Sequence, residues 1–413
     1  MALHDSYVSR RSFLMGSAVA AMAVGGAALA GCSNGGGSAS KSASASASAA
    51  SASSASASAS SASGPAITPN AEMEELNTVL LGKDAKIACI IVANQRGYYT
   101  DEKLTLNTQV VSGGFPEAMP MLSDGTVDVL PFGSIPTCTY VGQGDDLVIF
   151  GGTVTNGSEA LVLAENKDKY KKAEDFKGKK IACFRMETGH MVTKSWLRQQ
   201  GLKIGDKPEQ VDNGEADVAF VLLESMAAEA AAVENGEVDM CFVNSGQGYQ
   251  FTKEGKLAVA FQPQELIGHD FPCCRQSTNR KAFENKKSQL LKFEIANVRA
   301  MYDIANDKEG VVKDIMAYSG QPEDFCTAIT YGLGDYVAAM QFEMDPRTND
   351  VYSFYGDMVD NGDIQNPDKE LIVKHMDSSI YKAALDTLIQ RGEHADFYQG
   401  LLAKYEKNNT KGV

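Results

Sequence analysis

Apolar runs of strand length alternate with amphipathic stretches over much of this chain, a pattern that predicts a mixed α/β fold. Segments that read as strands occur at residues 86–92, 104–111, 127–132, 147–152, 160–164, 181–184, 216–223 and 238–243, and the first of them is an almost continuous apolar run. Apolar residues recur with a helical period between these runs and dominate the chain beyond Asn279, at 281–307, 308–318, 322–329, 378–391 and 394–407. Residues 66–81 read as a lead-in to the first strand. Strands that alternate with helices are typical of parallel sheets covered by helices.

Two segments share one pattern, a strand that carries Gly-x-Val-Asp and leads to a serine at a helix start. Residues 122–134 and 233–245 coincide at Gly125/Gly236, Val127/Val238, Asp128/Asp239 and Ser134/Ser245. The tetrapeptide Lys-Ile-Ala-Cys also occurs upstream of each, at 86–89 and 180–183. We therefore predict two similar α/β lobes with a ligand-binding cleft between them. The alternative is chance similarity between two ordinary strand–helix units.

Composition excludes some classes of protein. The length of 413 residues allows two or three domains, and 44% hydrophobic residues are typical of a globular chain. With 38 basic and 53 acidic residues the formal net charge is −15, which argues against a nucleic-acid partner. The charge says little about a small ligand, because one local cation outweighs it.

The N-terminal segment reads as an export signal. Residues 9–14, Ser-Arg-Arg-Ser-Phe-Leu, resemble the twin-arginine motif, and an apolar stretch follows at 15–30. The run Leu-Ala-Gly-Cys that ends at Cys32 is similar to the lipobox of bacterial lipoproteins. We expect residues 1–32 to be a signal peptide and the Cys32 thiol to receive a diacylglycerol. A short transmembrane anchor is the alternative.

Residues 33–65 are almost entirely Ser, Ala and Gly. Such a segment buries little apolar surface, so we predict a flexible tether with a reach of roughly 30 Å. Signal and tether together predict a folded part that is anchored by lipid at the outer face of the cytoplasmic membrane, in a periplasm or at a cell surface.

Seven cysteines follow Cys32, and an odd number without regular spacing is no disulfide framework. Cys89, Cys183 and Cys241 lie in apolar runs, where cysteine is usually buried. The adjacent pair Cys273-Cys274 allows a redox role, a metal-binding role or simple packing. No second Cys/His pair supports zinc, so the sequence favours packing.

The run Ala-Asn-Gln-Arg-Gly-Tyr-Tyr at 93–99 resembles a segment of the nitrate/sulfonate/taurine class of ABC-transporter solute-binding proteins, which includes thiamine-precursor-binding-like proteins. The Gly-x-Val-Asp strands, Phe-Lys-Gly-Lys-Lys-Ile-Ala at 176–182 and the segment 376–385 are similar to that family in the same order. The resemblance implies a type II periplasmic-binding fold, with two Rossmann-like lobes and a two-strand hinge. It implies a first lobe at 66–175, a second at 176–270, and a return to the first lobe with C-terminal helices at 271–413. The chain would cross between lobes near 160–178 and 265–278.

The family usually has several residues between the first strand and the Ala-x-x-x-Gly-Tyr helix, and that loop touches ligand. Here the strand expected at 86–92 runs almost directly into Ala93. We therefore expect the first loop not to reach the ligand.

In this architecture helix N-termini face the cleft, where free N–H groups and partial positive charge suit an anion. The predicted ligand-binding residues are Ser134, Thr153, Thr155, Asn156, Arg185, Thr188, Gly189, His190, Glu224, Asn244 and Ser245. Each has a simpler interpretation. Ser134 would be only an N-cap, and 153–156 a solvated hinge loop. Arg185 would pair with Glu187, His190 would lie on a helix surface, and Glu224 would be a helix-terminal charge.

No H-E-x-x-H, G-x-S-x-G or phosphate-loop motif is present, so the residues favour a binding protein over an enzyme. The resemblance implies a monomeric receptor that delivers a small polar or anionic organic solute, of the sulfonate, nitrate or heterocycle class, to the permease and ATPase subunits of an ABC importer. We expect neither a cofactor nor a metal. A surface ligand-sensing lipoprotein without a permease and an exported enzyme on the same fold remain alternatives.

Overall fold

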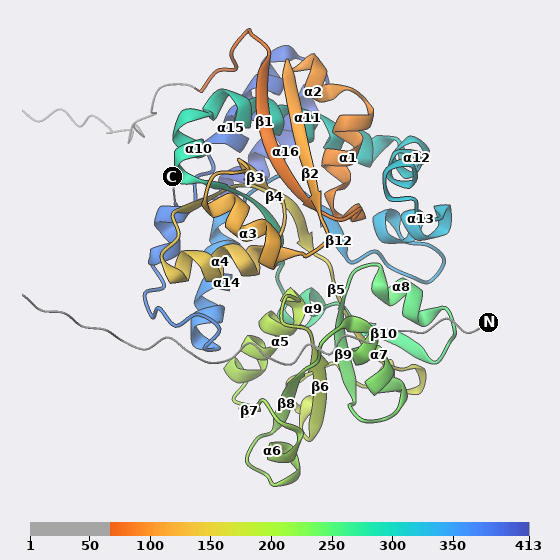
Figure 1. Ribbon diagram of the computed structural model, residues 1–413. Coiled ribbons are helices and arrows are strands. Elements are labelled where there is room, and N and C mark those ends of the chain that lie inside the picture. The colour runs from red at the N-terminus through yellow and green to blue at the C-terminus, as the bar shows by residue number, and fades with distance from the viewer. Residues whose placement is uncertain (1–66, 413) are drawn as a thin grey trace, which may run out of the picture. The chain divides into compact units, whose positions relative to one another are not determined.

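The computed structural model describes residues 67–412, in which helices cover two β-sheets (Figure 1). The predicted signal peptide, Cys32 and the Ser/Ala-rich tether lie outside the described residues. None of the described helices is both long enough and apolar enough to cross a bilayer.

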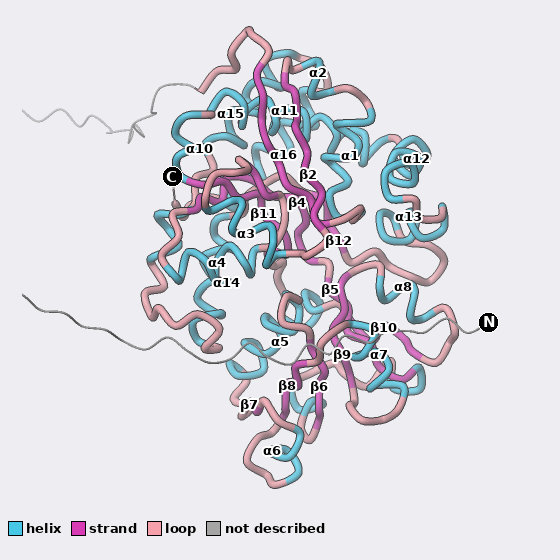
Figure 2. The backbone as a smooth tube through the Cα atoms, in the orientation of Figure 1, coloured by secondary structure: helices cyan, strands magenta, loops and turns pink. Residues whose placement is uncertain are grey.

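The first sheet contains six strands in the order β12-β4-β11-β3-β1-β2. Figure 2 draws the strands of both sheets in magenta. Their bounds are β1 Glu74–Leu81, β2 Leu104–Val111, β3 Val129–Leu130, β4 Leu147–Asn156, β11 Pro272–Asn279 and β12 Met340–Phe342. Strand β1 is parallel to β2 and β3, whereas β11 is antiparallel to β3 and β4. The helices of this lobe are α1 Ala88–Gln95, α2 Tyr98–Asp101, α3 Phe115–Ser123, α4 Ser134–Gln143, α10 Arg280–Asn285, α11 Lys287–Asn306, α12 Lys308–Ser319, α13 Glu323–Tyr331, α14 Thr348–Asp360, α15 Ser379–Arg391 and α16 Ala395–Asn408.

The second sheet has the order β10-β5-β9-β6-β8-β7. Its strands are β5 Ser158–Leu163, β6 Lys179–Cys183, β7 Ile204–Gly205, β8 Val218–Leu222, β9 Met240–Asn244 and β10 Leu257–Phe261, and its helices are α5 Thr188–Gln199, α6 Pro208–Asp212, α7 Met226–Glu234, α8 Gln247–Thr252 and α9 Pro263–Ile267. Successive side chains of a strand point to opposite faces. Ile181 therefore packs in one core with α5 and α9, while Ala182 packs in a second core with α7. The predicted mixed α/β fold class is confirmed.

The two Gly-x-Val-Asp strands occupy equivalent places in the two sheets. The Asp128 N–H donates to the Asn77 carbonyl over 2.8 Å, and the Asp128 carboxylate accepts from the Asn77 N–H over 2.9 Å. Asp239 makes the same pair of bonds with Lys180, over 2.8 and 2.9 Å. In each sheet the aspartate thus ties its strand to the neighbouring parallel strand, β1 or β6.

The strand predicted at 86–92 is wrong. Residues 85–87 form a 3₁₀ turn, Ala85–Ile87, and α1 follows directly. Asp84 caps this turn by accepting from the Lys86 N–H over 2.8 Å. Residues 88–93 are buried on every side, and a helix surrounded by core shows the same continuous apolar run as a buried strand. The first strand is instead β1, within the segment predicted to be a lead-in.

The identical tetrapeptides therefore adopt different structures. Residues 180–183 lie in β6, whereas 86–89 lie in the 3₁₀ turn and α1. Because Lys180 is equivalent to Asn77, the counterpart of 180–183 is 77–80. The Gly-x-Val-Asp segments are thus a structural repeat, whereas the match between the two tetrapeptides is coincidental.

The chain changes sheets at Gly157, because β4 ends at Asn156 in the first sheet and β5 starts at Ser158 in the second. This first crossover lies before the predicted range of 160–178, so the strand at 158–163 belongs to the second sheet and not to a first lobe ending at 175. The chain returns between β10 and β11. The two hinge segments are joined by bonds from the Asn156 N–H to the Phe271 carbonyl, 2.9 Å, and from Asn156 Nδ2 to Asp270 Oδ1, 2.8 Å.

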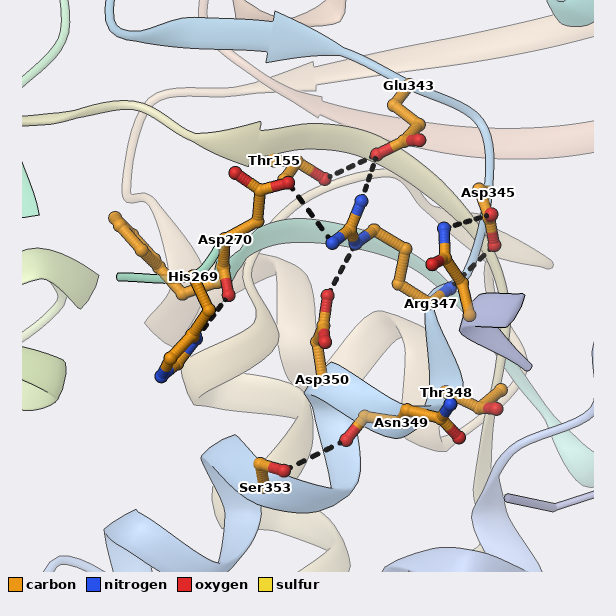
Figure 3. Close-up of polar contacts among 12 residues, drawn as sticks. Thr155, His269, Asp270, Glu343, Asp345, Arg347, Thr348, Asn349, Asp350 and Ser353 are labelled. Atoms are coloured by element: carbon orange, nitrogen blue, oxygen red, sulfur yellow. Dashed lines mark hydrogen bonds and ion pairs between the residues drawn. The ribbon is translucent and has the colours of Figure 1, made fainter. Parts of the chain in front are cut away.

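A polar cluster around Arg347 braces the hinge (Figure 3). Its guanidinium pairs with Asp270 on the hinge over 3.2 Å, with Glu343 over 3.3 Å, and with Asp350 over 2.5 Å. Glu343 also accepts from Thr155 Oγ1 over 3.0 Å. One arginine thus connects the hinge to the segment that leads into α14.

Helices of the two lobes also meet on either side of the hinge. Asn361, just after α14, donates to the Met191 carbonyl of α5 over 3.3 Å. Asp324 of α13 accepts from Tyr249 and Lys253 at the opposite helix α8, over 3.0 and 2.9 Å. The lobes therefore contact each other along two separate helix pairs.

Candidate functional site

A cavity of about 110 Å³ lies between the two sheets at the carboxyl ends of their parallel strands, the place where α/β folds bind ligands. Its walls come from the β1–α1 loop, the starts of α3, α4 and α5, the end of β9 and the start of β11. The lining residues are Leu81, Asp84, Lys86, Phe115, Phe132, Gly133, Ile135, Pro136, Met186, Thr188, Asn244, Cys273 and Cys274. Apolar side chains form most of the wall, with a few polar groups among them.

Other cavities are larger but fit this role less well. Those of about 770 and 630 Å³ lie within the first lobe, around α12 with α13 and around α10. A cavity of about 340 Å³ touches both lobes beside the hinge, but it is lined by the carboxylates of Asp270, Asp350 and Asp357. No described lysine or arginine lines that cavity to offset its three carboxylates, whereas Lys86 accompanies the single carboxylate, Asp84, of the smaller cavity, so we place the candidate site there.

Lys86 supplies the positive charge of the cavity. Burial acts to lower its pKa, but the surrounding Asp84, Cys273, Cys274 and Glu187 together raise the pKa above its usual value. Among the described residues no carboxylate forms an ion pair with the Lys86 ammonium within 4.0 Å. A charged amine without a direct ion pair in a largely apolar cavity is suited to an anionic ligand.

The expectation for the first loop rested on a strand at 86–92 that the structure does not contain, and Asp84 and Lys86 of this loop line the candidate cavity. With β1 ending at Leu81, residues 82–87 form a loop long enough to reach the cavity. Sequence reasoning missed both residues because it placed a strand over them. The available signal was the polar run Gly-Lys-Asp at 82–84, which separates the apolar residues 79–81 from the apolar run that starts at Ala85.

An internal carboxylate already occupies the N-terminus of α5. The buried Glu187 accepts from the N–H groups of Gly189 and His190, over 2.8 and 2.7 Å, and from the Ser158 hydroxyl. Burial acts to raise the pKa of Glu187, but its bonds to His190 and Ser158 hold the pKa below the usual value. The backbone N–H groups of Gly189 and His190 are thus used inside the protein, and the His190 ring lies beside the same carboxylate, with Nδ1 3.4 Å from Glu187 Oε2.

Four predicted residues do lie at the cavity or next to it. Thr188 and Asn244 line it. Ser134 is buried between the lining residues Gly133 and Ile135, and its Oγ has no hydrogen-bond partner among the described residues. It is the first residue of α4 and not the predicted N-cap, which is Gly133. Ser245 is buried beside Asn244.

The remaining predicted residues lie elsewhere. Thr153 donates to the Pro131 carbonyl over 2.9 Å, Thr155 binds Glu343, and Asn156 forms the hinge, so all three have structural partners. Arg185 and Glu224 are exposed and do not line the cavity.

Comparisons with known proteins agree with this architecture. The sequence model of the NMT1/THI5-like family matches residues 84–310. A putative aliphatic sulfonates-binding protein of Escherichia coli (strain K12) is 29% identical over 106 residues, which are 25% of this chain and 33% of that relative. The match thus spans about a third of the relative's length.

Two solved structures share the fold. The alkanesulfonate-binding protein SsuA from Xanthomonas axonopodis pv. citri, bound to MOPS, is 18% identical with a TM-score of 0.54, covering 75% of this chain and 100% of SsuA. The periplasmic nitrate-binding protein NrtA from Synechocystis PCC 6803 is 13% identical with a TM-score of 0.59, covering 78% and 90%. The predicted periplasmic-binding fold and the resemblance to the nitrate/sulfonate class are confirmed.

Proposed function

Since the chain belongs to the NMT1/THI5-like family, we propose that it is an extracytoplasmic solute receptor that holds a small organic anion in the interlobe cavity and presents it to an ABC importer. The observation that carries the proposal is the Lys86 ammonium, which projects into a cavity built by both lobes without an ion pair to a described carboxylate. The sulfonate- and nitrate-binding relatives support the same class of ligand.

The cavity walls indicate the shape of the solute. Leu81, Phe115, Phe132, Ile135 and Met186 offer an apolar surface, which suits a short hydrocarbon body. The anionic group would face Lys86, with the hydroxyls of Thr188 and Ser134 as further donors. A volume of about 110 Å³ is well below the roughly 300 Å³ of a drug-sized site. A short-chain sulfonate or carboxylate therefore fits better than a large heterocycle.

Binding at this cavity couples the ligand to the arrangement of the lobes. Lys86 and Phe132 belong to the first lobe, whereas Met186, Thr188 and Asn244 belong to the second. A solute that contacts both walls stabilises the arrangement in which both are within reach, and by no more than its differential affinity for it. A permease would recognise the ligand-loaded arrangement. The expected lipid at Cys32, the twin-arginine route and a monomeric state complete the proposal.

A ligand screen tests it. The purified full chain would be heated with alkanesulfonates, nitrate, short carboxylates and polar heterocycles, and its unfolding temperature compared with that of the free chain. A solute at about 100 times its dissociation constant should stabilise the chain by roughly 2.7 kcal/mol.

The substitution Lys86→Met should weaken binding of an anion roughly ten- to a hundredfold, because a charge-assisted hydrogen bond contributes about 1.5–3 kcal/mol. Lys83→Met is the matched control, since Lys83 is exposed on the same loop and does not line the cavity. If no anion stabilises the parent chain, or if the Lys86→Met chain binds as tightly as the parent, the proposal is wrong.

A further inference from the structure

Cys273 and Cys274, which are adjacent at the start of β11, both line the cavity. Cys273 Sγ and Cys274 Sγ are 3.8 Å apart, and each residue is 6% exposed. Neighbouring side chains of a regular strand point to opposite faces. Here the register of β11 against β4 is irregular on both sides of Cys274, and such a bulge turns neighbouring side chains toward the same side. Both residues are buried in the hydrophobic core, as the packing role favoured by the sequence requires, and both also line the cavity.

The surroundings activate one thiol of the pair. The pKa of Cys273 falls to about 6, mainly because Cys274 donates a hydrogen bond to its sulfur, with further lowering by the Lys86 charge and the Thr188 hydroxyl. Burial and the Glu187 carboxylate oppose this fall in pKa. The pKa of Cys274 is held well above its usual value by the same shared proton. A thiolate next to a thiol is the arrangement of a reactive cysteine and its resolving partner.

The other described cysteines lack this environment. Burial raises the pKa of Cys138 to about 12. Burial likewise raises the pKa values of Cys89, Cys183, Cys241 and Cys326. Because reactivity follows thiolate character, the chain contains inert thiols for comparison.

We propose that Cys273 and Cys274 form a redox-active dithiol that a small peroxide converts to a disulfide between the two adjacent residues. The Cys273 thiolate attacks one oxygen of hydrogen peroxide, the O–O bond breaks, and hydroxide leaves and takes up a proton to become water. The resulting sulfenic acid is attacked by the Cys274 sulfur, which loses its proton as the second oxygen departs as water. Two thiols and one peroxide thus give one disulfide and two waters, with the sulfurs oxidised by two electrons and the peroxide reduced.

The cavity selects the oxidant, and the adjacency of the cysteines makes the product reversible. A volume of about 110 Å³ admits several molecules of the size of water or peroxide but not a bulky disulfide reagent. Consecutive Cα atoms lie about 3.8 Å apart, closer than the roughly 4.4–6.8 Å of most disulfides. A disulfide between neighbours is therefore strained and easily reduced, as labile, regulatory disulfides are.

Oxidation would change the charge of the cavity. The thiolate beside Lys86 disappears, and the lysine charge loses one of the groups that balance it. A change in anion affinity on oxidation would rest on the proposed function. Formation of the disulfide does not, because it needs only the two sulfurs and a peroxide.

Peroxide oxidation of the reduced full chain tests the inference. After treatment with equimolar hydrogen peroxide and alkylation, the peptide that contains both cysteines should resist alkylation and weigh about 2 Da less than its reduced form. Dithiothreitol should restore it. The rate should be half-maximal near pH 6, the pKa of Cys273, while Cys138 stays reduced throughout.

In a Cys274→Ser chain the reaction should stop at a sulfenic acid on Cys273 that dimedone labels. The parent-chain result does not depend on the folding of that variant. The inference is wrong if the native peptide stays reduced, if it goes to sulfinic acid without a disulfide, or if Cys138 reacts as fast. A chain that forms the disulfide but binds no anion would overturn the receptor function alone.

Discussion

The carboxyl group of Glu159 makes the stability of the fold depend on pH. Glu159 lies in β5 and is fully buried. It accepts hydrogen bonds from the Gly248 N–H over 3.0 Å and from the Tyr336 hydroxyl. Burial dominates and raises its pKa from 4.5 to about 7, although these two bonds and the charge of Lys86 act in the opposite direction.

The raised pKa of Glu159 determines the direction and the size of the change in stability with pH. Below pH 4.5 the group is protonated in both the folded and the unfolded chain, so its contribution to stability is fully present. As the pH rises toward 7, the unfolded chain releases the proton while the folded chain retains it, and stability is lost. A shift from 4.5 to about 7, at about 1.4 kcal/mol per pH unit, makes this loss roughly 3 kcal/mol.

The substitution Glu159→Gln removes the ionisation and retains the amide oxygen as an acceptor. Urea unfolding of parent and variant at about pH 4.5 and about pH 8 would give the free energy of unfolding of each. We expect the parent to lose roughly 3 kcal/mol more than the variant between these values. Glu229 and Asp357, whose pKa values burial raises to about 9 and about 6, occur in both chains, so their contributions cancel. Glu165→Gln, at an exposed position, is the matched control. The same pH-dependent loss in the Glu159→Gln chain as in the parent would refute the reasoning.

Three further predictions concern the hinge, the cavity and the anchor. Arg347→Met should lower the free energy of urea unfolding by about 3 kcal/mol, because its carboxylate partners are left without a counter-charge. The control Lys382→Met removes an exposed ion pair and should lower it by less than about 1 kcal/mol. Equal losses in the two variants would contradict this prediction. Ser134→Ala and Thr188→Val should each weaken solute binding by about 1–3 kcal/mol in calorimetric titration, and unchanged affinity in both would move the site. Cys32→Ala should abolish labelling by radioactive palmitate in cells, and persistent labelling would refute the lipobox.

The internal repeat could be predicted from the sequence because the aspartate of each Gly-x-Val-Asp segment bonds to the backbone of the neighbouring strand. Asp128 and Asp239 each exchange two hydrogen bonds with the neighbouring strand, so the position requires a short carboxylate at a strand start in both lobes. The strand at 86–92 was not predictable from periodicity. Its apolar run is long because α1 is surrounded by core, and only the preceding segment 74–81, which ends at the polar run Gly-Lys-Asp, distinguishes the two interpretations. Because the strand was placed at 86–92, no loop was predicted there, and Asp84 and Lys86 were not identified as cavity residues.

The corrected register also explains why the two lobes contribute unequally to the site. Asp84 follows Asn77 by the same seven residues as Glu187 follows Lys180, so both lobes place an acidic cap after equivalent strands, β1 and β6. In the second lobe that carboxylate is fully buried and consumes the N–H groups of α5. In the first lobe the cap is followed by Lys86, at the position that Gly189 occupies in the second. If the helix N-termini alone determined binding, an anion would be expected at the equivalent helix starts of both lobes. Glu187 removes this option from the second lobe, and Lys86 adds a cation to the first. We therefore expect the first lobe to recognise the charge of a bound solute, and the second lobe to supply Thr188, Asn244 and apolar contact.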